Sequence, residues 1–243
     1  MSTTSVAPAA RRRLPDWGAP DPVYPRRNRT ALLALVTLPA LLVALVIGVL
    51  TGLAWLAALL AGAWVLKTCG DAFARDPLML RMLRARRIDP GEAPRLQNVA
   101  RGLAGDLGVP PPHLYLIPDG GANALVRKGG RGGVIAVTSS LLEHFTRTEL
   151  EAVIAHCLAR LHSAYFVYSN LAARWTDLGA GLAPRVGTSD DVRAAALTRY
   201  PPALVAALQK SDPRIKRYAP LWFVADAPSH DPIDVRVAAI SEL

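Results

Sequence analysis

Residues 146–160 read TRTELEAVIAHCLAR, and this stretch decides the fold of the chain. Thr146 followed three residues later by Glu149 forms a capping box, the pattern with which many helices begin. Apolar side chains then recur at helical spacing and mark a buried side: Leu150, Val153, Ile154, Cys157, Leu158 and Leu161. His156 and Arg160 lie one turn apart on a neighbouring stripe. The stretch predicts a long helix at the centre of a domain.

Within that helix, residues 156–160 (HCLAR) stand where a zinc peptidase carries HExxH. In HExxH, two His one turn apart bind a single Zn²⁺, and the Glu polarises the metal-bound water. Here Cys157 replaces the Glu, and a thiol cannot take the proton of the water as a carboxylate does. Arg160 replaces the second His, and a protonated guanidinium cannot bind a metal ion. The stretch therefore has the outline of a zinc site and lacks its chemistry.

The segments before the motif helix predict one further helix and a small sheet. The helix opens at residues 91–94 and ends near Gly108. His113–Ile117 and Val134–Thr138 have the apolar and aromatic composition of strands. Between them, Pro118–Gly133 is rich in glycine and predicts a loop that has room for a brief hairpin.

The segments after the sheet predict a mainly helical remainder. A short helix is expected at Leu141–His144, and later helices at Phe166–Leu178, at Asp190–Gln209 with an interruption near Pro201-Pro202, and at Ile233–Ser241. The fold class that follows is α+β, with a mostly helical body and a small sheet beside the motif helix.

Ala31–Leu66 contains no Asp, Glu, Lys, Arg, His, Asn or Gln. The run is about 54 Å of helix at about 1.5 Å per residue, close to two crossings of a bilayer core about 30 Å thick. Thr51-Gly52 offers a turn near its middle. The sequence therefore predicts a transmembrane helical hairpin with helices at Ala31–Leu50 and Leu53–Cys69. One long tilted span is the alternative, and a signal peptide or a buried soluble helix is disfavoured.

Basic residues flank this run on both sides: Arg11, Arg12, Arg13, Arg26, Arg27 and Arg29 precede it, and Lys67, Arg75, Arg81, Arg84, Arg86 and Arg87 follow it. The positive-inside rule places both flanks in the cytoplasm of a cell-membrane protein. The expected organisation is a disordered basic tail at 1–30, a transmembrane hairpin at 31–69 and a domain at 70–243, with Asp71–Arg87 continuing as a basic helix along the membrane surface.

The chain has 243 residues, a formal charge of +9 and two Cys. Two Cys without a secretory context do not indicate a disulfide framework. The basic charge is expected to lie against anionic membrane lipids. A nucleic-acid partner is not expected, because no recognition motif or interleaved aromatic pattern accompanies the arginines.

Residues 92–243 resemble peptidase family M48, the membrane-associated zinc endopeptidases of HtpX and Ste24 type. The resemblance rests on EAPRLQNVARGLAGDLGVP (92–110), HLYLIPD (113–119), the segment 122–125, VIAVTSSLL (134–142), TRTELEAVIAH (146–156) and the closing motif at 230–237, which is similar to HPxxxxRI. It implies a zincin-like domain in which His156 occupies the first zinc-ligand position, Cys157 the general-base position and Arg160 the second ligand position.

The resemblance also implies a Glu as third ligand on a later helix. The matching segment begins at Ser189, which puts Ser189 at that Glu position and Asp191 on an Asp of the family pattern, with Asp190 as a displaced ligand. Replacement ligands are poorly placed. His162 is six residues beyond His156 and points about 120° away along a helix, and His230 requires the C-terminal segment to fold over the site.

The sequence predicts a membrane-anchored, catalytically inactive M48-like protein that acts through binding. Its expected partners are membrane lipids and peptide or membrane-protein segments or an active relative, and no metal is expected. The alternative is a zinc-dependent metalloendopeptidase with a remodelled site, which would hold zinc. A membrane-surface electrostatic module is the third hypothesis. A cysteine hydrolase built on Cys157 is disfavoured, because His156 projects in another direction.

Overall fold

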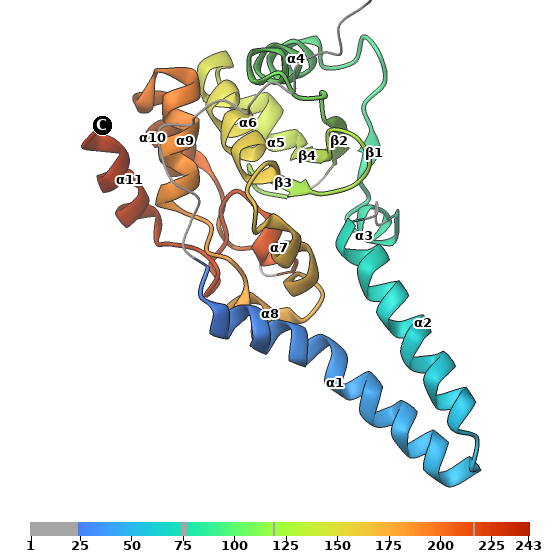
Figure 1. Cartoon of the computed structure of the whole chain (residues 1–243). Coiled ribbons are helices and arrows are strands. Elements are labelled where there is room, and N and C mark those ends of the chain that lie inside the picture. Colours follow the sequence, from blue (N-terminus) through green and yellow to red (C-terminus); the bar gives the residue numbers. More distant parts are fainter. Residues whose placement is uncertain (1–23, 74–76, 119, 216) are drawn as a thin grey trace, which may run out of the picture.

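The computed structural model describes residues 24–73, 77–118, 120–215 and 217–243. A pair of long apolar helices projects from a mostly helical body that holds one small sheet (Figure 1). The mostly helical character and the small mixed sheet agree with the predicted fold class.

The apolar helix pair consists of α1 (Arg26–Thr51) and α2 (Ala54–Phe73). Gly52 turns the chain between them with φ 68°, in the left-handed region that glycine adopts at little cost. The Trp64 Nε1–H donates to the Val36 carbonyl oxygen at 2.9 Å and ties the two helices together. Within the described residues, α1 alone is long and apolar enough to span a membrane, because the apolar part of α2, Ala54–Thr68, is shorter.

The first turns of α1 are embedded in the body. Leu32 and Val36 are buried among residues that follow the motif helix. Tyr24 is also buried; its ring lies 5.1 Å from that of Tyr168, and its hydroxyl donates to the Leu182 carbonyl at 2.7 Å. Residues 24–30 therefore belong to the folded part and not to the predicted tail. Residues 1–23 of that tail lie outside the described residues.

The sheet has the strand order β1-β2-β4-β3. Its central strands β2 (His113–Ile117) and β4 (Val134–Thr138) are parallel, with Tyr115 opposite Ala136, and both have the predicted bounds. Strand β3 (Ala124–Arg127) lies antiparallel to β4 at one edge, inside the segment predicted as a loop with a hairpin.

The prediction of one basic helix over residues 71–87 is wrong. Only α3 (Pro77–Met82) is a separate helix there, and Arg86–Arg87 forms the edge strand β1, antiparallel to β2. The change of direction occurs at Arg84, which has φ 51°. The chain then pairs with the sheet instead of continuing along the helix pair. Residues 74–76 lie outside the described part.

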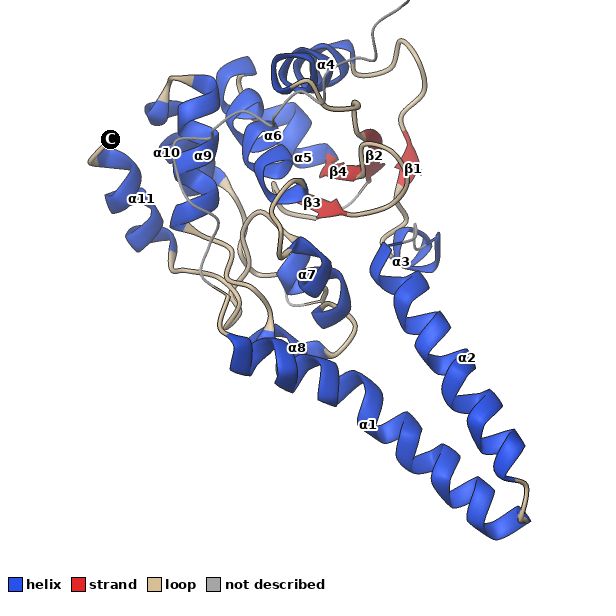
Figure 2. Ribbon diagram, in the orientation of Figure 1, coloured by secondary structure: helices blue, strands red, loops and turns tan. Residues whose placement is uncertain are grey.

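Helices surround the sheet, with α6 (Arg147–Leu161) at the centre of the body (Figure 2). The others are α4 (Pro94–Leu107), α5 (Ser139–His144), α7 (Phe166–Ala172), α8 (Thr176–Leu182), α9 (Thr188–Thr198), α10 (Pro201–Lys210) and α11 (Ile233–Ser241).

Two predicted helices are divided in the structure. The predicted helix at 166–178 ends at Ala172 and resumes as α8; Gly179 approaches the Ala172 carbonyl so closely that an added Cβ would lie 2.3 Å from it. The predicted helix at 190–209 breaks between α9 and α10, at the interruption expected near Pro201. Arg199, with φ 54°, ends α9, and proline then opens α10.

A segment near the C-terminus lies along the free edge of β3. After a 3₁₀ turn at Ala219–Leu221, Trp222 pairs with Leu125 in an antiparallel bridge. The Phe223 N–H donates to the Ala124 carbonyl at 2.8 Å. This edge segment, residues 220–224, packs its backbone against both the sheet and α6, and it forms one wall of the site described next.

Candidate functional site

The motif helix α6 begins with the predicted capping box. The Thr146 hydroxyl accepts from the Glu149 N–H, and the Glu149 carboxylate accepts from the Thr146 N–H at 2.8 Å. Lys210 of α10 forms an ion pair with Glu149 at 2.7 Å and joins the two helices. This arrangement fixes the start of α6, and the side chains at 156, 157 and 160 all lie in the buried interior.

His156 is fully buried and faces α9. Its Nδ1 lies 2.9 Å from Asp191 Oδ1, and its ring meets the edge of the Phe223 ring with centroids 4.8 Å apart. Burial lowers the pKa of His156 to about 4, although the Asp191 carboxylate opposes that shift. The neutral ring therefore donates from Nδ1 to the carboxylate. Its Nε2 carries a lone pair, and this atom has no partner among the described residues.

Asp191 is held by two elements besides α6. Arg236 of α11 donates to both of its oxygens, from Nε at 2.7 Å and from Nη2 at 2.8 Å. The Arg236 Nη1–H donates to the Phe223 carbonyl at 2.9 Å. Burial alone would raise the pKa of Asp191, but the guanidinium charge and the hydrogen bonds from Arg236 and His156 lower it to about 2. The chain thus buries a triad of Arg236, Asp191 and His156 in which both carboxylate oxygens of Asp191 are bonded.

Arg160 lies one turn beyond His156 and is also buried. Its Nη2 donates to the Pro220 carbonyl at 2.6 Å and its Nη1 to the Trp222 carbonyl at 3.1 Å, so the guanidinium grips the edge segment. Its Nε lies 3.7 Å from Asp190 Oδ2. Burial raises the pKa of Asp190 to about 6 despite this cation, and Asp190 Oδ1 has no partner among the described residues.

Cys157 and Ser189 take up the two remaining positions of the resemblance. Burial raises the pKa of the Cys157 thiol to about 12, so it is a neutral thiol at physiological pH. Ser189 lies in the first turn of α9, immediately before Asp190. A neutral thiol and a hydroxyl supply neither a general base nor a carboxylate ligand.

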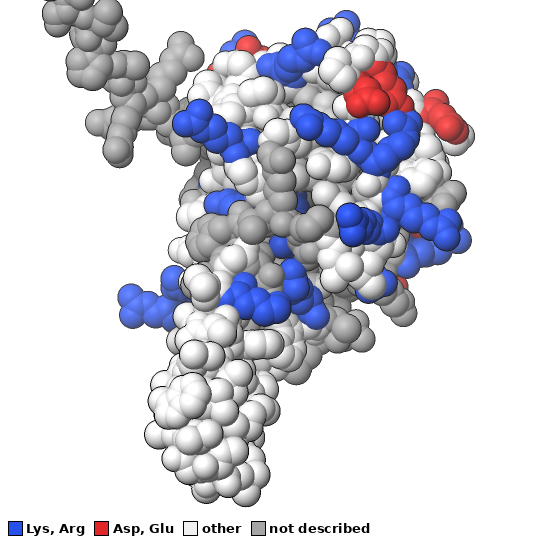
Figure 3. All heavy atoms as spheres, turned by 90° about the vertical axis from the view of Figure 1, so that its right-hand side faces the viewer, with Lys and Arg blue, Asp and Glu red and all other residues white. Residues whose placement is uncertain are grey.

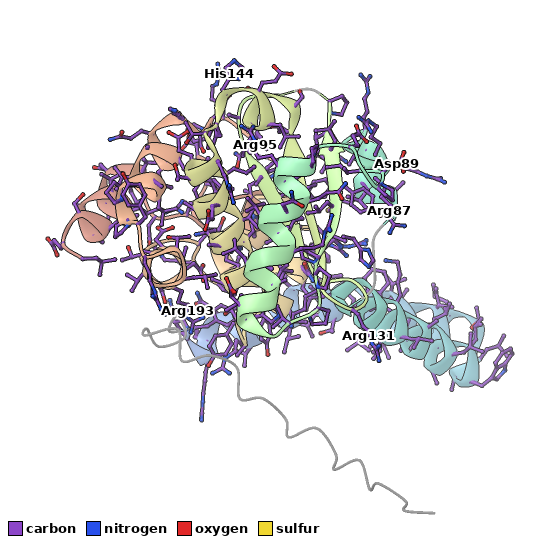
Figure 4. All side chains as sticks on the ribbon, turned by 90° about the horizontal axis from the view of Figure 1, so that it is seen from above. Arg87, Asp89, Arg95, Arg131, His144 and Arg193 are labelled. Carbon is purple, nitrogen blue, oxygen red and sulfur yellow. The ribbon has the colours of Figure 1, made fainter. Side chains whose placement is uncertain are left out.

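The other histidines do not join His156. His230 is buried, with Nε2 3.1 Å from the Trp222 carbonyl and Nδ1 3.1 Å from the Ser229 hydroxyl, and burial lowers its pKa to about 3. His162 Nδ1 donates to the Leu158 carbonyl at 2.9 Å. His144 is exposed at the end of α5, on the outer edge of the molecule (Figure 4). His230 thus binds the edge segment through the Trp222 carbonyl.

The donor set does not fit zinc. The described residues contain no cluster of three His, Cys, Asp or Glu side chains that could hold a metal ion. Among the described residues, no partner is found for the buried acceptors His156 Nε2 and Asp190 Oδ1. The Arg160 guanidinium beside Asp190 brings a fixed positive charge to that position and repels a cation. Two separated donors and a guanidinium do not make the four-coordinate shell of Zn²⁺.

In the part of the chain that the structure describes, the site around His156 is closed. His156 and Cys157 have no exposed surface, and the edge segment pairs with β3 beside them. Sequence reasoning missed this segment, because its contribution is made by backbone carbonyls, which carry no sequence signal. It also missed the role of Asn123, whose amide donates to the Asp212 and Val224 carbonyls and fastens the same segment.

Comparison with known proteins finds relatives for part of this chain. Residues 90–175 match the model of the family described as "Peptidase family M48". The chain is 37% identical over 99 residues to a protein named "Protease HtpX homolog" from Thermococcus sibiricus, a match that covers 40% of this chain and 34% of that protein. It is 34% identical over 140 residues to a protein of the same name from Persephonella marina, covering 53% of this chain and 49% of that protein. The matches thus span between a third and a half of the length of these relatives.

Proposed function

Residues 90–175 belong to peptidase family M48, and from that premise we propose that the chain is a membrane-anchored pseudopeptidase that acts through binding. Its relatives are named as proteases. We propose the loss of peptide cleavage for this chain and not for those relatives.

One observation carries the proposal: the second ligand position holds Arg160, and the protein uses this side chain structurally. The guanidinium is buried and donates to two carbonyls of the edge segment, so it has a stable place in the interior. Without a second imidazole, a metal ion at His156 would lack ligands and would meet a positive charge. Cys157, a neutral thiol, offers no base to a water molecule.

Membrane anchoring is supported by α1 and by the uncharged run at residues 31–66. Leu38, Leu42 and Leu50 are among the large apolar side chains of the pair that lie exposed on its surface. Figure 3 shows the resulting uncharged stalk below a belt of Lys and Arg side chains. An apolar surface of this extent is stable in a bilayer and costly in water. We propose that both ends of the pair are cytoplasmic, as the positive-inside rule favours.

The test uses the full chain, purified in detergent, as the wild type and two variants. Zinc content by mass spectrometry and cleavage of unfolded casein are measured for the wild type, for His156→Ala and for the triple change Cys157→Glu/Arg160→His/Ser189→Glu. We expect no zinc in the wild type above that in His156→Ala, and no cleavage. Zinc binding by the triple variant would show that only the replaced positions prevent a metal site.

Near-stoichiometric zinc in the wild type, lost in His156→Ala, would overturn the proposal. His156 is a buried partner of Asp191, so His156→Ala could also disturb the fold. A second readout therefore uses the wild type alone: any zinc-dependent cleavage must stop when 1,10-phenanthroline removes the zinc. Circular dichroism of each variant confirms that it is folded.

A zinc metalloendopeptidase with a remodelled site is the second candidate. Two observations favour it: the unpartnered His156 Nε2, and the Asp191 hydrogen bond that would orient this ring toward a metal. For zinc to bind, Arg160 would have to leave the carbonyls of Pro220 and Trp222. Zinc-dependent cleavage in the test above would establish this candidate.

A further inference from the structure

A groove of about 520 Å³ lies beside α4, at the end of the body away from the tip of the apolar helix pair (Figure 1). Its walls are residues 87–90 at the end of β1, residues 111–114 at the start of β2, and Gln97, Ala100 and Arg101 on one face of α4. Seen from above, Arg87 and Asp89 lie to one side of α4, near the end that carries Arg95 (Figure 4). Arg87, Asp89 and Arg101 are exposed, so the groove opens to solvent.

Hydrogen bonds fix one wall of this groove. The Gln97 amide donates from Nε2 to the carbonyl oxygens of Asp89 and Glu92, at 2.7 Å in each case. Glu92 in turn forms an ion pair with Arg86 of β1. The Arg101 Nη2–H donates to Gln97 Oε1 at 2.9 Å, which holds the guanidinium at the rim. Helix α4 and the end of β1 are thus tied together, and the groove is preformed.

The floor of the groove is apolar. Ile88 and Ala100 are buried members of the main core, and Leu114 is a partly buried residue that packs against it. Pro112, which also lines the groove, is buried. An apolar side chain of a ligand therefore gains free energy by covering this floor.

The rim of the groove favours a ligand with a single negative charge. Arg87 and Arg101 bring two guanidinium groups, and Asp89 brings the only carboxylate among the described residues that line the groove. Within the described part of the chain, the Arg87 guanidinium and the Asp89 carboxylate form no hydrogen bond or ion pair, and Arg101 bonds only the neutral Gln97. Guanidinium groups bind a carboxylate through paired hydrogen bonds. Asp89 repels a ligand that carries several negative charges.

An open strand edge borders the groove. Strand β1 is an outer strand of the sheet, and its Arg87 lies opposite Tyr115 of β2. The Ile88 N–H donates to the Leu114 carbonyl at 3.0 Å, so the backbone of Ile88 faces the sheet. Backbone groups alternate in direction along an antiparallel strand, and the N–H and C=O of Arg87 therefore face outward. An extended peptide can pair with groups of this kind.

We propose that this groove binds the C-terminal end of a peptide whose last residue is apolar. The terminal carboxylate is bound by Arg101, and the last side chain covers the floor at Ile88 and Ala100. The peptide backbone pairs with the outward N–H and C=O of Arg87. A terminal carboxylate carries the single negative charge that the rim favours, and backbone pairing distinguishes a peptide from other carboxylic acids. The proposal rests on the proposed function, that this chain acts through binding, and it names a partner class and a site.

The experiment measures peptide binding by isothermal titration calorimetry, with the full chain in detergent. The probe is an N-acetylated hexapeptide of Gly and Ser that ends in Leu, and it is compared with the same peptide carrying a C-terminal amide. Arg101→Gln removes the proposed carboxylate partner. Arg131→Gln is the matched control, because it removes an exposed guanidinium that lies well apart from Arg87 and Asp89 (Figure 4).

We expect the peptide with the free carboxylate to bind the wild type and the Arg131→Gln variant with a Kd of about 100 µM, as suits a short ligand in an open groove. Binding should be at least about tenfold weaker to Arg101→Gln, and at least about tenfold weaker for the amide, because each change removes hydrogen bonds to a charged group. N-methylation of the last peptide bonds should also weaken binding, since backbone pairing needs those N–H groups.

Equal binding of the acid and the amide, equal loss in Arg101→Gln and Arg131→Gln, or no binding to the wild type would overturn the proposal. Octanoate has a carboxylate and an apolar chain but no peptide backbone. If octanoate displaced the peptide at equal concentration, the groove would be a site for carboxylic acids in general, and the peptide assignment would be wrong. Failure of the proposed function has a different signature, zinc-dependent cleavage of casein, which Arg101→Gln would leave unchanged.

Discussion

The two halves of the site around α6 differ in what holds them together. On one side, His156, Asp191 and Arg236 form a closed network in which the carboxylate is bonded by both partners. On the other side, Arg160, which the sequence resemblance puts at a metal-ligand position, bonds backbone carbonyls. By the resemblance drawn from the sequence, the first half holds positions that match the M48 pattern, and the second half holds positions that differ from it.

The difference is explained by the cost of removing each part. Loss of Asp191 or Arg236 leaves the other charge buried without its partner, which is among the most costly changes in a protein interior. A change at a reacting position is tolerated when the new side chain satisfies its own polar atoms. Arg160 does so through the edge segment, and Cys157 does so by staying uncharged. The proposed loss of cleavage is compatible with a stable scaffold for this reason.

The largest effect is expected from Arg236→Met. This change removes the cation that lowers the pKa of Asp191 and leaves the buried carboxyl group with only the His156 hydrogen bond, so it should lower the free energy of unfolding by about 3–5 kcal/mol. Urea unfolding of the full chain in detergent, followed by circular dichroism, measures it. The matched control is Arg185→Met, which breaks an exposed ion pair with Asp231 and should cost about 0–1 kcal/mol. Equal effects of the two changes would contradict the claim that the buried network around Asp191 is costly to disturb.

A smaller effect is expected from Arg160→Met. The carbonyls of Pro220 and Trp222 lose their donors, at a cost of about 1–3 kcal/mol. Asp190 then lacks its cation, but its pKa of about 6 shows that it takes up a proton readily, which limits the cost. The same unfolding measurement applies. If Arg160→Met lowered the free energy of unfolding by more than Arg236→Met does, the half formed by His156, Asp191 and Arg236 would not be the more costly one to disturb.

Acidification should weaken the fold. His156 and His230 have pKa values of about 4 and about 3 in the folded chain, so between about pH 6.5 and about pH 5 they take up protons only on unfolding. Asp190, with a pKa of about 6, takes up a proton in the folded chain over the same range. This proton cancels one of the two that the histidines take up on unfolding. The net difference of about one proton lowers the free energy of unfolding by about 1.4 kcal/mol per pH unit.

Unfolding midpoints across that range check the slope, and one variant sharpens it. Asp190→Asn removes the group that titrates in the opposite sense, so the slope should rise to about 2.7 kcal/mol per pH unit. A flat profile in the wild type would mean that the two buried imidazoles are already protonated in the folded chain.

Sequence reasoning succeeded where local pattern and burial coincide. The capping box at Thr146 and the strands at 113–117 and 134–138 were predicted with their bounds, because caps and apolar runs are local signals. The interruption near Pro201 was predicted for the same reason. The helix start at Arg26 was missed, since it depends on the burial of Tyr24 against a helix more than a hundred residues away.

The partners of the site residues were less accessible from sequence. The substitution of Arg160 was plain, but its hydrogen bonds go to carbonyls, which every residue has. The approach of Asp191 to His156 joins two helices, and no local pattern specifies that distance. The resemblance supplied the positions of these residues, and only the fold supplied their contacts.

The smallest effect is expected from Cys157→Ala, a change on the side of the site that contains Arg160. If the thiol serves only as a small apolar group, Cys157→Ala should cost about 1 kcal/mol, because little more than one sulfur atom leaves a packed interior. Cys157→Ser has nearly the same shape but buries a hydroxyl, so it should cost more, about 1–3 kcal/mol if no partner is found. In the folded chain the thiol should resist iodoacetamide, since it is buried and its pKa is raised to about 12. Peptide mapping after labelling measures the modification of Cys157 separately from that of Cys69, and the unfolded chain is the positive control. Rapid labelling of Cys157 in the folded chain would mean that the thiol is accessible and activated. The half of the site that contains Arg160 and Cys157 would then hold a reactive nucleophile.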